Sequence, residues 1–379
     1  RTRTTPRVDQ RTGHLAFAVA SCQSYPAGHY AAYRHMAEQD LDLVVFLGDY
    51  LYEGPQQGQI GRGHLPNYEI RSLEDYRIRY GQYKSDPDLR AAHAAFPWLV
   101  TIDDHEVENN FADEDSDPDS DPAEFLRRRA AAFQAYYEHQ PLRLASMPDG
   151  PDMALYRRFR YGDLAEFSVL DTRQDRSDQA CGGGVTERCE EAYDPTRTMT
   201  GPAQERWLLD GLGESRARWN TIAQQTLMAE LDFQAGEPAL YNMDNWAGYV
   251  PARERILTFL RERQPSNPVV LTGDIHASFV NDLKADFANP SSVTLGTEIA
   301  CTSISSGKGN NGQIEAALPE NPHVKFYNGR QRGYVRCDVT RDQWRANLLF
   351  VDDVSNPDSP VRSQARYVIE DGRPGAQPF

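Results

Sequence analysis

The chain has 379 residues, of which 39% are apolar and 25% charged, and its 56 acidic and 40 basic residues give a net charge of −16. This composition is typical of a globular protein and excludes intrinsic disorder, and no apolar run approaches the roughly 18 residues that a membrane helix needs. The negative charge repels nucleic acid and anionic lipid at long range unless cations intervene, so we expect no nucleic-acid partner.

The predicted secondary structure alternates between strands and helices. Helical patterns occur at 30–39, 126–140 and 253–263, and the segments 333–340 and 345–354 flank a turn and predict an antiparallel hairpin. The alternation predicts an α/β fold with mixed or parallel sheets, and no Pro/Gly-rich linker divides the chain, so we expect one domain over residues 1–379. Short apolar segments predict strands at 15–22, 42–50, 98–106, 165–173, 221–229 and 268–276.

An acidic stretch, DEDSDPDSDP at 113–122, interrupts this pattern. Crowded like charges with Ser and Pro favour a solvated loop that self-repulsion keeps extended. A surface calcium site is the alternative interpretation.

The cysteine count is odd. Cys181 and Cys189 flank a Gly-rich loop that can turn back on itself, which predicts a disulfide. Cys301 and Cys337 are available for a second bridge, although sequence alone does not fix connectivity. Disulfides indicate an oxidising compartment, so we expect a secreted protein whose leader has been removed. Cys22 is left over, which indicates a ligand or a nucleophile, against the alternative of a buried apolar cysteine.

Several predicted strands end in polar side chains that can bind metals. In α/β sheets, ligands bind beyond the carboxyl ends of the strands, so these ends should converge on one site. Burying so many carboxylates beside apolar strands costs several kcal/mol each unless cations compensate, which favours a multinuclear metal site. The residues are Cys22, Gln23, Asp49, Tyr52, Asp103, Asp104, His105, Glu106, Asn109, Asn110, Asp171, Arg173, Asp274 and His276.

The ligand types narrow the choice of metal. A thiolate from Cys22 together with a carboxylate and a phenol from Asp49 and Tyr52 suits a trivalent first-row ion such as Fe(III). Oxygen ligands from Asp49, Asp104 and Asp274, with the Asn109/Asn110 pair, suit calcium. A water or hydroxide held between such ions has a lowered pKa and is a ready nucleophile for attack at phosphorus.

Five sequence strings occur in the order of a known family. They are ASCQ at 20–23, GDYLYE at 48–53, DDHEVENN at 103–110, LDTRQ at 170–174 and TGDIH at 272–276. Together they resemble the motifs of PhoD-like alkaline phosphatases, which are relatives of the purple acid phosphatases. The resemblance implies a metallophosphoesterase-type four-layer sandwich of two mixed sheets flanked by helices. A weaker string, WAGY at 246–249, also resembles a family segment, without an assigned function.

The resemblance implies specific metal ligands. Cys22, Asp49, Tyr52 and the Asp274/His276 pair resemble the iron-binding set, and which member of that pair binds iron stays open. Asp49 would bridge to one or two calcium ions, or to another divalent ion in their place. Further calcium ligands would be Asp104, Asn109 and Asn110.

Two further residues are expected to act on the substrate. His105 resembles the phosphate-contacting histidine of the related GNHE motif, so we expect it to protonate the leaving oxygen or polarise a phosphate oxygen. Arg173 is either a phosphate clamp or the partner of Asp171 in a structural salt bridge. Asp103 is left out of the site, because strand alternation points it away from Asp104.

The implied function is that of a secreted Fe(III)- and Ca(II)-dependent phosphoesterase. Members of the family act as alkaline phosphatases, as phosphodiesterases and as phospholipase D enzymes without the HKD motif, so a phospholipid headgroup is one expected substrate. Few basic residues lie at the strand ends, which favours diesters slightly. The family usually carries a β-sandwich before the ASCQ strand. We expect this piece to be absent here, whether cleaved, lost or supplied as a separate fragment.

Two other classes of function remain as alternatives. One is a thiol hydrolase with Cys22 as nucleophile and His105 or His276 as base, which leaves Tyr52 and the acids unexplained. The other is a non-enzymatic calcium-binding module that uses the 113–122 loop, which leaves Cys22 unexplained.

Overall fold

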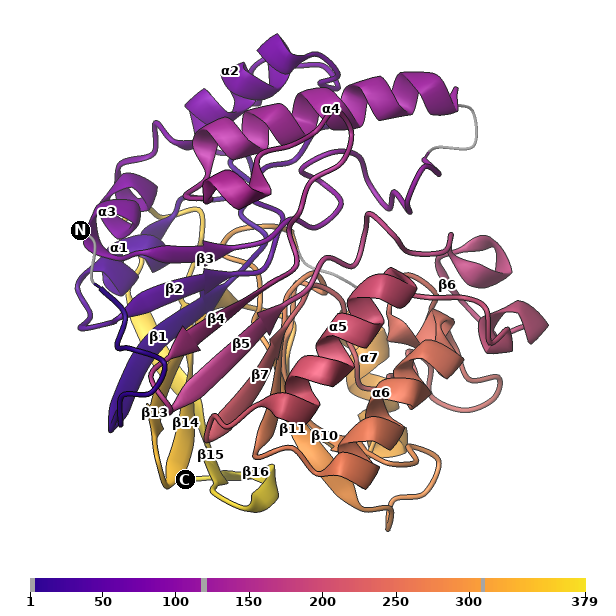
Figure 1. Ribbon diagram of the computed structural model, residues 1–379. Coiled ribbons are helices and arrows are strands. Elements are labelled where there is room, and N and C mark those ends of the chain that lie inside the picture. Colours follow the sequence, from indigo (N-terminus) through magenta and orange to yellow (C-terminus); the bar gives the residue numbers. More distant parts are fainter. Residues whose placement is uncertain (1–3, 117–120, 308–310) are drawn as a thin grey trace.

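A computed structural model describes residues 4–116, 121–307 and 311–379. Two seven-stranded sheets pack face to face, with helices on their outer faces (Figure 1). In the first sheet, β1, β2 and β3 run parallel to one another and the remaining strands continue antiparallel from β1. Its strands, in spatial order, are β16 (Arg373–Pro378), β15 (Val361–Glu370), β14 (Gln343–Val351), β13 (Arg332–Thr340), β1 (His14–Ala20), β2 (Leu43–Phe46) and β3 (Trp98–Val100).

The second sheet is also mixed. β11, β9, β7 and β5 are parallel neighbours, and antiparallel strands flank them on both sides. Its strands, in spatial order, are β12 (Val324–Asn328), β10 (Ser278–Lys284), β11 (Thr294–Ala300), β9 (Pro268–Thr272), β7 (Trp219–Ala223), β5 (Ala165–Val169) and β4 (Arg157–Tyr161). A separate two-stranded ribbon joins β6 (Val185–Thr186) to β8 (Tyr241–Asn242).

The helices form the outer layers. The first four lie over the β1–β3 side of the first sheet, whereas α5 and α6 cover the second sheet (Figure 1). Capping side chains fix several helix starts; for example, Asp121 accepts a hydrogen bond from the backbone N–H of Ala123 at the start of α4. The helices are α1 (Ala31–Ala37), α2 (Leu73–Tyr83), α3 (Pro87–Ala95), α4 (Pro122–His139), α5 (Gly201–Glu214), α6 (Val250–Arg263) and α7 (Asn311–Ala317).

Three apolar cores separate the four layers. Side chains from both sheets, such as Phe17 of β1 and Phe167 of β5, form the central core. A second core lies between the first sheet and α1–α4, and a third lies between the second sheet and the α5–α6 pair. The expected four-layer α/β sandwich of two mixed sheets is therefore confirmed. Within the described parts of the chain, no helix has the length and apolar character needed to cross a bilayer.

The predicted strands are all present, but each ends earlier than predicted. The strand expected at 98–106, for example, is β3, which ends at Val100, and the polar residues that follow leave the sheet. The hairpin of β13 and β14 is also confirmed. The strands β4, β6, β8, β10, β11, β12, β15 and β16 were not predicted. β15 is largely exposed and polar, so its sequence lacks the apolar run that a buried strand shows.

One of the two predicted disulfides is confirmed and the other is wrong. Cys181 and Cys189 are joined, as the Gly-rich loop between them indicates. The expected Cys301–Cys337 bridge is wrong: both residues are free and buried. Cys301 follows β11 of one sheet and Cys337 lies in β13 of the other, so each thiol packs as an apolar group in the central core.

Candidate metal centre

The site forms where the carboxyl ends of strands from both sheets meet. β1, β2 and β3 lead into Cys22, Asp49 and Asp104, and all three side chains are buried. β5 and β9 of the second sheet lead into Arg173 and His276. This is the arrangement in which α/β sheets bind ligands, and it brings together side chains more than 250 positions apart.

Two glycines allow these loops to approach closely. A Cβ at Gly48 would lie 2.5 Å from the Cβ of Asp103, and one at Gly273 would lie 2.8 Å from the Cβ of Ser21. Only a residue without a side chain fits there. Four site residues also adopt a left-handed backbone, which is unfavourable for L-residues and concentrates at functional sites. They are Cys22 (φ 58°), Asp49 (φ 57°), Asp274 (φ 58°) and His276 (φ 53°).

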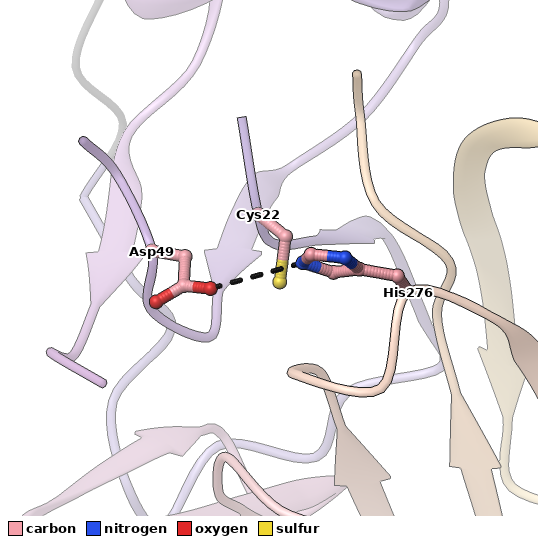
Figure 2. Close-up of side chains that lie close together, drawn as sticks. All are labelled: Cys22, Asp49 and His276. Atoms are coloured by element: carbon pink, nitrogen blue, oxygen red, sulfur yellow. Dashed lines mark ion pairs between the residues drawn. The ribbon is translucent and has the colours of Figure 1, made fainter. Parts of the chain in front are cut away.

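The first group of potential ligands consists of Cys22, Asp49 and His276, whose ligand atoms all lie within 4.8 Å of one another. Figure 2 shows the thiol, the carboxylate and the imidazole facing a common space, with Asp49 Oδ2 4.0 Å from Nε2 of His276. Tyr52 adds its phenol: Oη donates to Asp49 Oδ2 at 2.9 Å and lies 3.0 Å from Nε2 of His276. Ser306 donates a hydrogen bond to that same phenol oxygen at 2.7 Å, which holds the ring of Tyr52 in place.

The second group shares Asp49 with the first. Asp49, Asp104 and His105 offer ligand atoms within 4.8 Å of one another. Nδ1 of His105 lies 2.7 Å from Oε2 of Glu53, so the imidazole has a fixed orientation. Because the two groups share Asp49, its carboxylate would contribute a ligand to a cation held by either group.

The donor chemistry of these groups fits bound cations. Asp49 Oδ1 is buried without a hydrogen-bond partner, which is costly unless a positive charge faces it. Asp104 Oδ1 also lacks a hydrogen bond, although it lies 3.7 Å from Nη2 of Arg173. Burial, followed by the charge of Asp49, raises the pKa of the Cys22 thiol, and burial raises the pKa of Asp49. Burial also lowers the pKa of His276 to about 3, with a contribution from Arg332, so the imidazole is neutral and free to ligate. Thiolate, carboxylate, phenol and imidazole together suit a trivalent first-row ion.

Glu106 holds the two main loops together. Its carboxylate accepts from the backbone N–H of Tyr50 at 2.6 Å, of Asp103 at 2.8 Å and of Asp49 at 3.2 Å. Burial raises the pKa of Glu106 to about 7. Glu106 therefore fixes the spacing between the loops that follow β2 and β3 rather than facing the ligand groups.

Arg173 is buried and forms ion pairs with several acidic residues. Its guanidinium is fully buried; Nε donates to Asp103 at 2.6 Å, and the two terminal nitrogens donate to Asp244 at 3.0 Å each. Of the two interpretations of Arg173, the salt bridge with Asp171 is wrong, because that carboxylate instead accepts from the backbone N–H of Arg173 at 2.9 Å and closes a turn. The phosphate-clamp interpretation has little support from a side chain with no exposed surface.

Asp103 lies outside both ligand groups, but the reason given for leaving it out is wrong. It was excluded by strand alternation, but β3 ends at Val100, so the alternation does not extend to Asp103 and Asp104. Both carboxylates lie beside Arg173, Asp104 Oδ1 at 3.7 Å from Nη2. Burial raises the pKa of Asp103 to about 7, whereas for Asp104 the effect of burial is outweighed by Arg173 and then His105, and its pKa is lowered.

Three predicted ligands lie outside these groups. Asn109 and Asn110 have exposed side chains, and their backbone N–H groups donate to Glu53 at 2.8 Å and to Asp104 at 2.7 Å. Asp274 is half-buried and belongs to neither ligand group, so His276 is the member of its pair that lies with Cys22. Their roles as ligands stay predictions. The acidic loop falls partly on residues 117–120, which lie outside the described residues.

The environment of Cys22 is unlike that of a catalytic thiol. A nucleophilic cysteine needs a lowered pKa and access to substrate. Cys22 has no exposed surface, and burial raises its pKa. The thiol-hydrolase alternative therefore has no support from the geometry.

The chain is similar to known proteins in sequence and in fold. Residues 17–348 match the family described as PhoD-like phosphatases. The chain is 47% identical over 383 residues to alkaline phosphatase D of Bacillus subtilis (strain 168), a match that covers 99% of this chain and 65% of that protein. A solved structure named "Structure of PhoD" matches with a TM-score of 0.95 at 46% identity and covers 100% of this chain and 74% of that chain. The chain thus spans slightly less than two thirds of the length of its Bacillus relative.

Proposed function

The chain belongs to the PhoD-like phosphatase family, and from this premise we propose that it is a secreted phosphoesterase that requires Fe(III) and Ca(II). The observation that carries the proposal is the pair of ligand groups that share Asp49. Cys22, Asp49, Tyr52 and His276 would hold iron, and Asp49 with Asp104 would hold one or two calcium ions, or another divalent ion in their place. When bound, the cations would lower the pKa of a water molecule and neutralise charge on the phosphate ester.

The residues of the chain supply orientation and proton transfer. Glu53 engages Nδ1 of His105, so Nε2 is the ring atom left for the substrate. From this position Nε2 would protonate the leaving oxygen or polarise a phosphate oxygen. Because His105 also belongs to the second ligand group, its imidazole lies within reach of any phosphate held there.

The arginines beside the site favour phosphodiesters over phosphomonoesters. A monoester dianion needs cationic groups for neutralisation. Arg173 is fully buried between Asp103 and Asp244. Arg332 donates a hydrogen bond to the carbonyl of His276 at 2.8 Å. Neither is placed to meet a second phosphate charge. A diester, with a single charge, makes a smaller demand, and phospholipid headgroups belong to this class.

The disulfide supports the secreted location, because such bonds persist in oxidising compartments. We also retain two proposals from the sequence, that residues 1–379 form one domain and that a separate N-terminal fragment associates with it. Neither feature is needed for the two ligand groups to form.

A substrate panel tests the proposal. The purified protein is assayed with bis-p-nitrophenyl phosphate, p-nitrophenyl phosphate and phosphatidylcholine, the last by choline release, with added Fe(III) and Ca(II). We expect the diester to be hydrolysed fastest and activity to be lost in EGTA and restored by calcium. Hydrolysis that is indifferent to EGTA would refute the calcium requirement, and no hydrolysis of any of the three esters would overturn the proposed function.

A further inference from the structure

The carboxylate of Asp244 contacts the side chains of Arg173, Arg176 and Gln179, although Asp244 follows none of the predicted strands. It lies just after β8 (Tyr241–Asn242) and is 6% exposed. Its carboxylate accepts two hydrogen bonds from Arg173 at 3.0 Å each, one from Gln179 at 2.9 Å, and forms an ion pair with Arg176 at 3.0 Å. These contacts lower the pKa of Asp244 well below its usual range, because the two arginines outweigh the effect of burial.

The guanidinium of Arg173 is shared by three carboxylates. Asp244 occupies its outer edge, Asp103 binds Nε at 2.6 Å, and Asp104 lies 3.7 Å from Nη2. The Asp104 oxygen on that side, Oδ1, has no hydrogen bond, so Arg173 forms only a long ion pair with it. Asp104 is thus free for the second ligand group only as long as the other two carboxylates hold the guanidinium.

We propose that Asp244 is a positioning residue that keeps Arg173 from capturing Asp104, and thereby sets the affinity of the second ligand group for a divalent cation. The proposal rests on the proposed function of that group. If Asp244 were neutral, the guanidinium of Arg173 would keep its charge, and its terminal nitrogens would turn toward Asp104, whose Oδ1 lies 3.7 Å from Nη2. The same uncompensated charge would repel an incoming cation.

The position of Asp244 is itself fixed by its neighbours. Met243 donates its backbone N–H to the carbonyl of Gly184 at 2.8 Å, and β8 pairs with β6, inside the loop closed by the disulfide. On the other side, Tyr249 of the WAGY string accepts from Arg176 at 2.7 Å and so holds that arginine against Asp244. Through Tyr249, the WAGY string therefore has a structural role, which is to hold Arg176 in place.

Calcium titration without substrate tests this inference. The iron-loaded parent, stripped of calcium with EGTA, is compared by calorimetry with Asp244→Asn, which removes the charge, and Asp244→Glu, which restores it. We expect calcium to bind about tenfold more weakly to Asp244→Asn and within about threefold of the parent to Asp244→Glu. Glu230→Gln is the matched control, because Glu230 also lies between two arginines, Arg188 at 2.7 Å and Arg253 at 2.6 Å.

The outcomes separate positioning from simple stability. The inference is supported if Asp244→Asn and Glu230→Gln lose equal thermal stability but only Asp244→Asn binds calcium more weakly. Parent-like calcium affinity in a folded Asp244→Asn overturns it. If that variant does not fold, Arg173→Lys keeps the charge but cannot bridge Asp103 and Asp244; the same tenfold loss is expected, and an unchanged affinity overturns the inference. A parent that binds no calcium overturns the proposed calcium site, and this inference with it.

Discussion

Nδ1 of His105 lies 2.7 Å from Oε2 of Glu53, although 52 residues separate the two in the chain. The other oxygen of Glu53 accepts from the backbone N–H of Asn109 at 2.8 Å, so the carboxylate also anchors the loop that follows His105. This pairing fixes the ring orientation of a histidine that lies next to two potential ligands.

Glu53→Ala should therefore lower kcat more than it raises KM. Without the carboxylate the imidazole of His105 loses its fixed orientation, and partners of this kind are typically worth about tenfold to hundredfold in activity. Steady-state kinetics on a diester measure the effect. Glu138→Ala is the control, because Glu138 pairs with Arg77 at 2.6 Å on the surface. Equal kinetics for Glu53→Ala and Glu138→Ala would contradict the assignment.

Cys22→Ser should remove the colour of the protein. A thiolate and a phenolate bound to Fe(III) absorb visible light through charge transfer, and we expect both absorptions to vanish because the iron is lost when serine replaces the thiol. The visible spectrum of the purified protein measures this. Cys301→Ser is the control, because Cys301 is also buried and free. A colourless but fully active parent would rule out an Fe(III) centre at Cys22.

A thiol titration checks the cysteine pairing. Protein unfolded without reductant should show three free thiols, from Cys22, Cys301 and Cys337. Only one would be found if the last two formed a second bridge. Reduction of Cys181–Cys189, which closes a loop with a sequence separation of 8, should lower stability by roughly 2–3 kcal/mol on the chain-entropy model. For a chain of this length, the melting temperature would then fall by about 3 °C.

The folded protein should lose stability in mild acid through His64. Nδ1 of this buried ring lies 2.7 Å from the carbonyl of Gly54, and Nε2 lies 2.8 Å from Tyr83 Oη. Burial, with the charge of Arg79, lowers the pKa of His64 to about 4 from 6.5. Because the unfolded chain takes up the proton first, stability is fully present above pH 6.5 and falls as the pH drops toward 4, by up to about 3 kcal/mol.

Denaturant unfolding at pH 7 and pH 4.5 measures this loss. His64→Gln keeps a donor for Gly54 and an acceptor for Tyr83, so its stability should depend less on pH than that of the parent. His14→Gln, at an exposed histidine, should follow the parent. An equally steep acid dependence in His64→Gln would show that other groups cause the loss.

The sequence was most informative at the carboxyl ends of the parallel strands, where metal-binding side chains follow the apolar residues. Apolar strands that end in polar residues marked the edge of the sheets, and five motifs at those ends identified the family correctly. The positions of Cys22, Asp49 and His276 were predictable for this reason, because parallel strands bring their carboxyl ends to one edge.

Residues that act through other side chains could not be found in the same way. Asp244 follows β8, which has two residues, and its contact with Arg173 joins positions 71 apart that share no local pattern. Glu53 lies within a recognised motif, but its hydrogen bond to His105 depends on how two loops fold together. The argument for leaving out Asp103 was wrong because alternation was carried past the end of β3, although Asp103 does lie outside both ligand groups.

The metal content of Asp49→Asn tests the central claim most directly, because Asp49 is the residue that both ligand groups share. Elemental analysis of the parent should find iron and calcium, and Asp49→Asn should lose both metals. Cys22→Ser should lose iron alone. If folded Asp49→Asn retained iron and calcium at the parent's ratios, Asp49 would not join two cation sites and the account would be contradicted.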